Sequence, residues 1–469
     1  MRATRTIAVL ALALAVASPG ALADPKANAP KEAKKLTPQQ QAETLFDQGR
    51  EAMFRGRYKE AVELLEKAAK LDKTKTRYRL YLARAHRYAK NTDQAETLLA
   101  AIVKASPEHV EAGQTLGEMY IEQEKWREAA NVLGGLLRYR HDYPTYHMLA
   151  EAKYNLDDLK AAKKYFKEAV KLNPDSAVDH YQLGNTHLAE NLFALAAESY
   201  KRAITLGLRS GVLHYKLGSA YFNLRNYFGR VSEVTVKSGK PGTVNGPWYL
   251  IEPVPGKTDV WRAAPSDSAI YQVVKAVDAG LDNEGDIQFL RANIYLNARR
   301  YRQAYDMLKK LAAAAPKPAE DKRTKEDKAL FHYYFAQAAF GVEKFDEYLS
   351  LLKKAIELHG EAYQATLVDA YLRVAEQHNQ LGDLKGYIQY LQMAVEEAPK
   401  KVSPHLKLGY AFEESRRYGD AIVQWRMVLD LQPDHSKRME LLDLIRKYRA
   451  DLEDRPAKPK AGTKRARLG

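Results

Sequence analysis

The chain contains no cysteine among its 469 residues. This absence excludes disulfide frameworks, zinc fingers, thiol catalysis and a lipid-modified N-terminal cysteine. Glycine and proline are also few, at 26 and 19 residues, so gross disorder is not expected over most of the length. A chain this long exceeds one ordinary globular core. It must therefore form several domains or a repeat array that grows along one axis.

Motifs for catalysis and ligand binding are missing as well. No H-E-x-x-H, G-x-S-x-G or EF-hand pattern occurs, and the twelve histidines are scattered. The sequence Gly-Lys-Thr at residues 256–258 resembles the end of a phosphate-binding loop, but Ile251 stands where that loop requires glycine. We therefore expect no enzymatic activity, no metal site and no cofactor.

The long apolar run of this chain lies at its N-terminus. Arg2 and Arg5 precede an apolar run over residues 7–17, and a small-x-small cleavage sequence follows at residues 21–23. This is the pattern of a secretory signal peptide over residues 1–23, and an uncleaved membrane anchor is the alternative. We expect an exported protein, soluble after cleavage and located in the bacterial periplasm.

The formal net charge is +15, which favours acidic partners without choosing among a membrane surface, an acidic polymer and an acidic protein. Six basic residues and no acidic residue lie within residues 455–469, and the C-terminal tail, residues 454–469, is expected to be disordered. This tail could bind an acidic polymer or an anionic membrane surface, and a purely solvated tail is the alternative. Export argues against nucleic acid as a partner.

A small residue recurs with a period near 34 residues. The positions are Gly49, Ala83, Gly117, Ala150, Gly184, Gly218, Ala292, Ala336, Ala375 and Gly409. In most repeats a second small residue follows twelve positions later and a bulky residue sixteen positions later, as Ala129 and Leu133 follow Gly117. Small residues let two antiparallel helices approach closely, and bulky residues fill the adjacent groove. The pattern predicts a series of helix pairs.

These repeats resemble the tetratricopeptide repeat. The clearest ones place Leu-Gly at 116–117 before Tyr120, Trp126, Ala129 and Leu133, and Leu-Gly at 408–409 before Phe412, Tyr418, Ala421, Trp425 and Pro433. Others depart from the pattern, since Arg291 stands where leucine is usual and Tyr348 and Tyr387 replace the second small residue. The resemblance implies an all-α, right-handed superhelical solenoid of about ten helix pairs.

The repeat phase divides the chain into segments. We expect a flexible leader at 24–41, repeats one to five with the first helix of repeat six at 42–227, an insertion at 228–267, the second helix of repeat six with repeats seven to ten at 268–433, and a capping helix at 434–453.

The insertion is the most individual part of the sequence. Two β-prone runs, at 231–236 and 248–251, flank a stretch rich in glycine and proline, which predicts a β-hairpin. Trp248, Tyr249 and Trp261 could form a contact site for a partner, because tryptophan and tyrosine are favoured anchors. A surface loop with its own small packing cluster is the alternative.

The resemblance also implies that first helices line a concave face, with residues three before and one after the small position pointing into it. Four consecutive repeats then pair an aromatic ring with a small polar residue: Tyr181 with Asn185, Tyr215 with Ser219, Phe289 with Asn293, and Tyr333 with Gln337. Aromatic rings supply anchors, and amides pair with the main chain of an extended segment. The pattern predicts a peptide-binding groove, with ordinary repeat packing as the alternative.

Earlier repeats carry charges at these positions. Arginines of the second repeat and glutamates of the third are expected to pair across the repeat boundary rather than to bind a partner: Arg77, Arg84, Arg87, Glu111, Glu118 and Glu122.

The function that we expect is a non-catalytic adaptor in envelope or secretion-complex assembly, which holds an extended protein segment on its concave face. The alternative is a polysaccharide-export or cell-wall scaffold whose aromatic groove contacts glycans.

Overall fold

The computed structural model describes residues 36–281, 285–314 and 323–453. The predicted signal peptide, most of the predicted leader and the basic tail lie outside these residues. The chain divides into two compact units, an N-terminal unit that ends at Arg140 and a C-terminal unit that begins at His141. Within the described ranges, no helix is both long enough and apolar enough to cross a bilayer.

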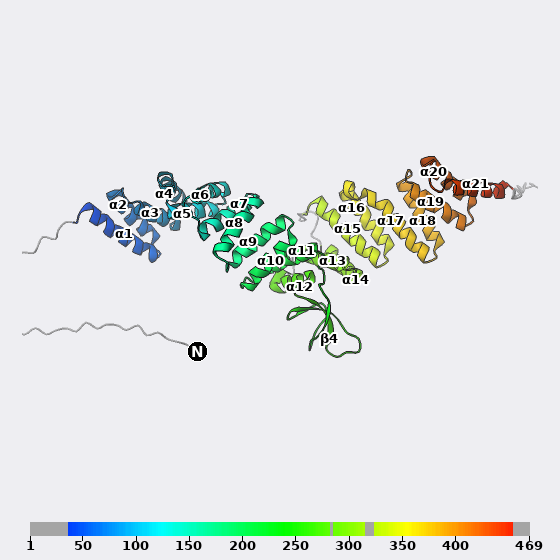
Figure 1. The fold of residues 1–469 in the computed structure, drawn as a ribbon, viewed down its shortest axis with the longest axis horizontal. Helices are drawn as coiled ribbons and strands as arrows, with labels where there is room; N and C mark the ends of the chain where they lie inside the picture. The colour runs from blue at the N-terminus through cyan, green and yellow to red at the C-terminus, as the bar shows by residue number, and fades with distance from the viewer. Residues whose placement is uncertain (1–35, 282–284, 315–322, 454–469) are drawn as a thin grey trace, which may run out of the picture. The chain divides into compact units, whose positions relative to one another are not determined.

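Helices pack as consecutive pairs in both units (Figure 1). In the described part of the N-terminal unit the helices are α1 (Pro38–Phe54), α2 (Tyr58–Leu71), α3 (Thr76–Tyr88), α4 (Thr92–Ala105), α5 (Val110–Glu122) and α6 (Trp126–Leu136). Each helix packs on the one before it and the one after it within this unit.

The C-terminal unit continues the same arrangement. Its described helices are α7 (Tyr143–Asn155), α8 (Leu159–Leu172), α9 (Ala177–Ala189), α10 (Phe193–Thr205), α11 (Gly211–Asn223), α12 (Ala269–Ala276) with a π-helical turn at Val277–Leu281, α13 (Gly285–Asn297), α14 (Tyr301–Ala313), α15 (Lys325–Gly341), α16 (Phe345–Leu358), α17 (Gly360–Gln380), α18 (Leu384–Glu397), α19 (Val402–Glu414), α20 (Tyr418–Leu431) and α21 (Arg438–Glu453). The described residues thus form ten helix pairs, and α21 packs against α20 as the predicted capping helix.

Small residues of the first helices mark where the two helices of a pair cross. A Cβ atom added to Gly117 would lie 2.6 Å from Leu133, and one added to Gly409 would lie 2.4 Å from Trp425. Since real Cβ atoms do not approach other atoms this closely, the bulky residue sixteen positions later fills the space that the small residue leaves open. The pairing of small and bulky positions predicted from the sequence is confirmed.

A second periodic feature lies in the turn between the two helices of each pair. Seven residues after every small position, the backbone adopts a positive φ between 56° and 73°. The residues are Gly56, Lys90, Glu124, Asp157, Asn191, Arg225, Arg299, Glu343, Gly382 and Arg416. A left-handed residue ends a helix within a tight turn. Most of these residues are not glycine, so residue type alone does not reveal the turns in the sequence.

The first helix begins earlier than the sequence predicted. Residues 38–41 were assigned to a flexible leader, but α1 starts at Pro38. Thr37 and Gln40 form a capping box, in which each side chain accepts a hydrogen bond from the backbone N–H of the other. This box and a proline at the first helical position stabilise the helix start.

The insertion is a small antiparallel sheet of four strands within the described residues. The strands are β1 (Ser232–Thr235), β2 (Val244–Asn245), β3 (Trp248–Pro253) and β4 (Val260–Pro265), in the order β1-β4-β3-β2. The two runs that were predicted to pair as a hairpin do not pair with each other. Each pairs with β4, at Val234–Trp261 and Leu250–Ala263, because the later run at 260–265 forms a strand rather than an extended return.

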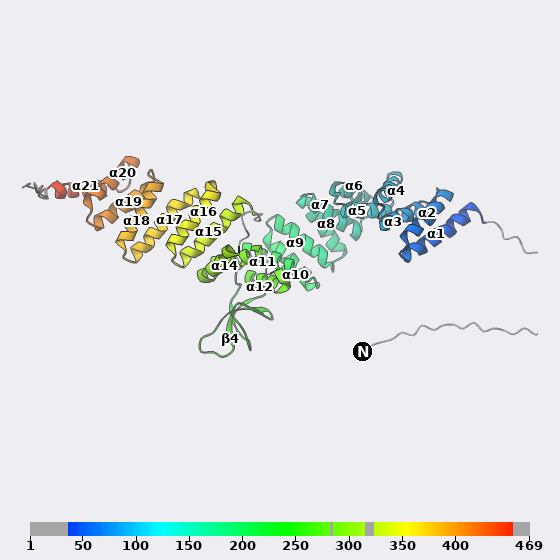
Figure 2. The same cartoon turned by 180° about the vertical axis from the view of Figure 1, so that it is seen from behind.

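The sheet leaves and rejoins the helices at one place, between α11 and α12. Asn226 and Tyr227 follow α11, and their carbonyl oxygens accept hydrogen bonds from the backbone N–H groups of Ala269 and Ile270 at 2.9 and 3.0 Å. Ser268 occupies the N-cap position of α12, but its hydroxyl donates to the carbonyl of Pro265, the last residue of β4, at 2.6 Å rather than capping the helix. The sixth helix pair therefore closes as the others do, and the sheet projects beside α12 (Figures 1 and 2).

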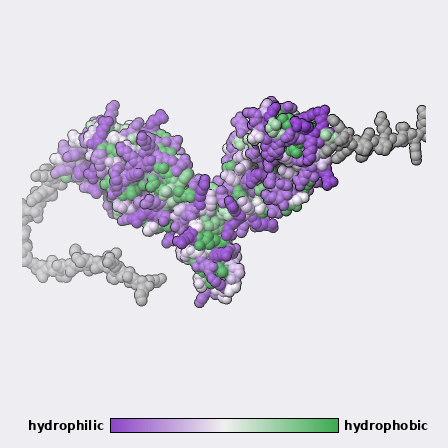
Figure 3. Space-filling view, turned by 45° about the vertical axis from the view of Figure 1, so that its right-hand side comes forward, coloured by the Kyte–Doolittle hydropathy of each residue, from purple (hydrophilic) through white to green (hydrophobic). Residues whose placement is uncertain are grey.

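Both faces of the sheet are packed. Tyr249 lies on the face toward the helices, where it joins the main core of the C-terminal unit. On the other face, Leu250 and Trp261 form a separate small core, and the loop at Gly239 folds over them. Figure 3 shows apolar side chains gathered where the sheet meets the helices and within the sheet itself. The insertion is a folded module rather than an open loop.

Candidate functional site

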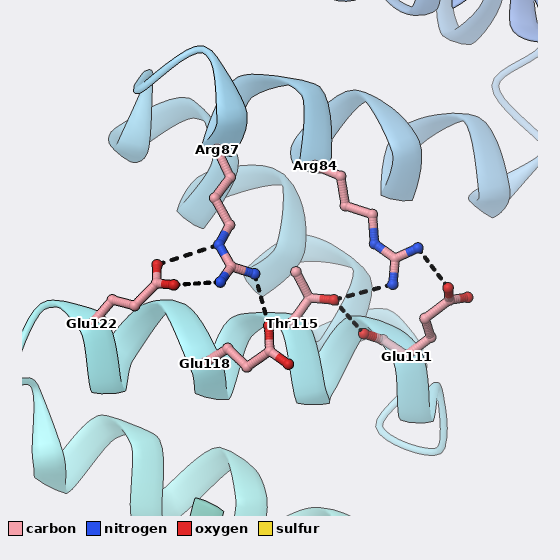
Figure 4. Close-up of polar contacts among 6 residues, drawn as sticks. All are labelled: Arg84, Arg87, Glu111, Thr115, Glu118 and Glu122. Carbon is pink, nitrogen blue, oxygen red and sulfur yellow. Dashed lines mark hydrogen bonds and ion pairs between the residues drawn. The ribbon is translucent and has the colours of Figure 1, made fainter. Parts of the chain in front are cut away.

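Within each unit, the first helices of the pairs present side chains on a surface here called the first-helix face. In the N-terminal unit this face is charged and internally paired (Figure 4). Arg84 of α3 lies 2.6 Å from Glu111 of α5, and Arg87 lies 2.8 Å from Glu118 and 2.5 Å from Glu122. The predicted pairing across the repeat boundary is confirmed.

Thr115 joins this network from the buried side of α5. Its hydroxyl donates to the Glu111 carbonyl at 2.8 Å and accepts from Arg84 at 3.4 Å (Figure 4). Nearer the N-terminus, Arg77 pairs with Glu43 of α1. Each of these arginines therefore meets a carboxylate from a neighbouring first helix.

The first-helix face of the C-terminal unit has a different character. At the predicted pair of α9, Tyr181 is half-buried but Asn185 is only 6% exposed. The Asn185 side-chain oxygen accepts hydrogen bonds from the Tyr200 hydroxyl at 2.9 Å and from the Lys216 ammonium at 2.8 Å. Internal groups therefore use the Asn185 oxygen, and its binding to a partner's main chain stays a prediction.

The predicted pair of α13, Phe289 with Asn293, is likewise engaged in contacts within the chain. Phe289 is half-buried and packs its ring 5.8 Å from those of Phe331 and Tyr334 of α15. Asn293 is buried, and its backbone carbonyl accepts a hydrogen bond from Asn297 at 2.9 Å. Phe289 thus packs against α15, the next first helix, and Asn293 is buried within the chain. Tyr215 and Ser219 of α11 are both half-buried on the intervening helix.

The pair of α15 borders a cavity. Tyr333 and Gln337 line a hollow of about 430 Å³ formed by α13, α15 and α17. Its other lining residues are Leu296, Asn297, Tyr301, Tyr334, Phe340, Gly341, Glu343, Arg373 and Gln377. The Tyr333 ring stacks on that of Tyr363 at 5.0 Å, which fixes its orientation. This hollow combines aromatic rings, amides and one guanidinium, and it is the candidate site of the molecule.

Two cations of this face were not predicted. Arg373 of α17 donates to the Gln337 side-chain oxygen at 3.2 Å and lies 4.3 Å from the Phe340 ring centroid. Lys216 of α11 lies 5.5 Å from the Tyr181 ring centroid, and burial lowers the pKa of its ammonium group. Both stand two residues before the small position of their repeat, whereas the sequence argument tested the positions three before and one after.

The aromatic residues of the insertion serve the fold. Tyr249 is 2% exposed, and its hydroxyl is hydrogen-bonded to that of Tyr295 of α13. Trp261 is buried in the small outer core, and Trp248 packs half-buried against that core. The strand pairing thus turns the rings of Tyr249 and Trp261 into packed cores, and the hypothesis that they contact a partner stays a prediction.

A second hollow, of about 790 Å³, lies in the N-terminal unit. It is lined by Asp47, Arg50, Glu51, Met53, Phe54, Tyr58, Tyr81 and Tyr88. The Phe54 ring is 89% exposed, and the sequence argument did not identify it. The cation of this hollow is satisfied within the chain, since Arg50 pairs with Asp47 at 3.5 Å and lies over the rings of Phe46 and Tyr81. We therefore place the candidate site at the hollow of α13, α15 and α17.

Among the described residues, no group of three or more histidine, aspartate or glutamate side chains has the geometry to hold a metal ion.

Comparisons with known proteins agree with the helix pairs. Two sequence profiles described as tetratricopeptide repeats match the chain, one at residues 52–108 and 87–153 and the other at residues 143–176. No curated protein sequence matches the chain significantly. Similar solved structures include MamA of Desulfovibrio magneticus RS-1, with 21% identity over 35% of this chain and 94% of that protein and a TM-score of 0.34. PilF of Pseudomonas aeruginosa has 15% identity over 40% of this chain and 86% of that protein, with a TM-score of 0.35.

Proposed function

We propose that this chain, whose residues 52–176 match tetratricopeptide-repeat profiles and whose helices pack as consecutive pairs, is a non-catalytic, exported adaptor with the architecture of a protein-interaction scaffold. It holds an extended segment of another protein along the first-helix face of repeats five to nine. The role that we assign to this binding is the assembly of an envelope or secretion complex. The signal-peptide pattern of residues 1–23 supports export.

One observation carries the proposal, namely the hollow of about 430 Å³ on α13, α15 and α17. Ligand sites are typically concave and apolar, with a few polar groups that fix orientation. Here Tyr333 and Tyr334 supply rings, Gln337 and Gln377 supply amides, and Arg373 supplies a cation. An extended segment would place an apolar side chain among the rings and its main chain beside the amides.

Site-specific photocross-linking in the native host tests this proposal. We would replace Tyr333 with p-benzoylphenylalanine, which keeps an aromatic ring at the hollow, and place the same group at Tyr139 as a control. Tyr139 follows α6 in the N-terminal unit and is 53% exposed, so it reports chance encounters. We expect a protein adduct from position 333 that is absent from position 139.

Mass spectrometry of the adduct separates the possible outcomes. A cross-linked peptide from an exported protein supports the adaptor proposal. A glycan adduct would replace it with the polysaccharide-scaffold alternative. Equal adducts from both positions would contradict a role for the hollow.

A further inference from the structure

Cations on the first-helix face are of two kinds, those that pair with a carboxylate of a neighbouring first helix and those that do not. In the N-terminal unit, Arg77, Arg84 and Arg87 each meet a carboxylate of a neighbouring first helix. Near the C-terminal end of the chain, Lys407 of α19 again meets Glu376 of α17 at 3.4 Å. Pairing across repeat boundaries is therefore the common arrangement of this face, and a cation without a carboxylate departs from it.

Lys216 is the first such cation. Its ammonium group carries three donors but has one hydrogen bond, to the Asn185 oxygen, besides its position over the Tyr181 ring. In the described part of the chain no carboxylate forms an ion pair with it, and burial alone lowers the pKa of its ammonium. Burying a charge costs free energy unless an opposite charge compensates it. A carboxylate placed beside Lys216 would provide that compensation.

Arg373 is the second. Its guanidinium carries five N–H donors, of which one binds the Gln337 oxygen and another interacts with the Tyr348 hydroxyl, and it lies over the Phe340 ring. Glu343 lines the same hollow, but among the described residues neither it nor any other carboxylate forms an ion pair with Arg373. Glu376, three residues further along α17, is instead paired with Lys407. The guanidinium therefore keeps donors available at the edge of the hollow.

We infer that the segment held on this face is acidic, with one carboxylate bound at Lys216 and a second at Arg373. The inference rests on the proposed function and specifies the chemistry of the partner. Lys216 lies on α11 and Arg373 on α17, three repeats further along the chain. With neighbouring helices about 10 Å apart, the two cations are separated by roughly 30 Å. At about 3.3 Å per extended residue, the two acidic residues of the partner stand roughly nine positions apart.

The residues between the two acidic positions have their own requirement. The hollow at Tyr333 and Tyr334 lies on α15, between the helices that carry the two cations. An apolar or aromatic side chain of the segment fills it. The expected recognition pattern is thus acidic, apolar and acidic along an extended chain. The net charge of +15 accelerates encounter with such a segment.

A selection of random 16-residue peptides displayed on phage, against the full mature chain, tests this inference. We expect enriched peptides to carry two acidic residues roughly nine positions apart. The affinity of one enriched synthetic peptide is then measured by calorimetry. Lys216→Gln and Arg373→Gln should each weaken binding about tenfold, which corresponds to the loss of one charge-assisted hydrogen bond.

Matched variants separate local recognition from net charge. The double variant Lys164→Gln/Arg426→Gln removes as much charge as Lys216→Gln and Arg373→Gln remove together, but from exposed positions on the second helices α8 and α20. Its affinity for the peptide should stay within about twofold of wild type. Asn185→Asp places a carboxylate beside Lys216 within the chain. This variant should abolish the acidic preference at that end while the Arg373 end keeps its own.

The outcomes distinguish this inference from the proposed function. Enriched peptides without acidic residues that still lose binding in Tyr333→Ala would overturn the inference and leave the groove standing. Equal losses in the Lys164→Gln/Arg426→Gln control would also overturn it, because net charge would then explain the preference. The proposed groove itself would be contradicted if no peptide were enriched, or if the enriched peptides bound the Tyr333→Ala variant as tightly as they bind wild type.

Discussion

In the N-terminal unit Arg84 and Arg87 meet carboxylates of the next first helix, whereas Lys216 and Arg373 of the C-terminal unit meet amide oxygens and aromatic rings. Both sets occupy the first-helix face of the same kind of repeat. A face whose charges are paired internally gains little by binding another charge. A face with incompletely satisfied cations gains hydrogen bonds when an anion arrives. The difference locates binding capacity in the C-terminal unit.

The largest expected effect concerns Asn185, which joins the two donors of the C-terminal face. Asn185→Ala removes the acceptor of both the buried Tyr200 hydroxyl and the Lys216 ammonium. Two unsatisfied groups of this kind cost about 3 kcal/mol of the free energy of unfolding. Hydrogen exchange of the α9 and α11 amides should report the loss, since exchange follows local stability.

Asn185→Asp is the control for this substitution. It keeps an oxygen that can accept the hydrogen bonds of Tyr200 and Lys216. It also gives Lys216 a carboxylate partner, as Arg84 has in the N-terminal unit. We expect its stability to remain within about 1 kcal/mol of wild type. An equal loss in both variants would mean that the side chain acts by shape rather than as an acceptor.

The next effect comes from reversing one charge in each unit. Arg87→Glu breaks the pairs with Glu118 and Glu122 and places three carboxylates together, which should destabilise α3 and α5 by about 2 kcal/mol. Arg373→Glu breaks no ion pair among the described residues, but it removes the hydrogen bond to Gln337 and the contact over the Phe340 ring, so a smaller loss of about 1 kcal/mol is expected. Urea unfolding followed by hydrogen exchange compares the two variants. Similar losses in both would remove the distinction between the two faces.

Much of the fold was predictable because the repeat imposes one packing rule on every pair. Gly117 with Leu133, and Gly409 with Trp425, stand sixteen positions apart and touch in the structure. The insertion was less predictable. A run of β-prone residues does not name its partner strand, and β1 pairs with the distant β4 rather than with the nearer β3.

The site was predictable only in part. Tyr333 and Gln337 line the hollow as expected from the repeat phase. The internal hydrogen bonds of Asn185 were not predicted because its neighbours in space, Tyr200 and Lys216, lie 15 and 31 residues away, and no local pattern shows that they will use its oxygen. Arg373 was missed because it stands two residues before the small position, as Lys216 does, whereas the sequence argument tested the positions three before and one after.

A pH-dependent contact also belongs to the C-terminal face. His147 of α7 donates to the fully buried carboxylate of Asp179 of α9 at 2.5 Å. This hydrogen bond raises the pKa of His147 above its ordinary value near 6.5. Burial opposes the charge of Asp179, but hydrogen bonds from His147 and Ser176 outweigh it and hold the pKa of Asp179 below its usual value.

The sign of the pH effect follows from these shifts. A raised histidine pKa stabilises the fold below about pH 6.5, and that stability is lost as the pH rises through the folded pKa. The lowered pKa of Asp179 stabilises the fold above about pH 4. We expect α7 and α9 to lose about 1–2 kcal/mol between pH 6 and pH 9, the contribution of one charge-assisted hydrogen bond.

His147→Gln should remove this pH dependence. Burial lowers the pKa values of His187 and His332, so any contribution from them has the opposite sign, with stability gained as the pH rises. The arginine pairs of the N-terminal unit keep their charges, so the opening free energies that hydrogen exchange gives for the α3 and α5 amides should not fall between pH 6 and pH 9. A uniform loss in both units would show that the His147–Asp179 pair is not its source.

The smallest effect is expected at Arg77, whose pair with Glu43 is 51% exposed on the arginine side and 42% on the glutamate side. Arg77→Gln should cost no more than about 0.5 kcal/mol, because water replaces most of the interaction and the Tyr78 hydroxyl still donates to Glu43. Unfolding at about 0.05 M and 0.5 M NaCl checks this, since salt should remove even that difference. A loss above 1.5 kcal/mol that survives high salt would mean that pairing on the N-terminal face serves stability. A small, salt-sensitive loss would instead mean that its main effect is to leave no cation available to an acidic partner.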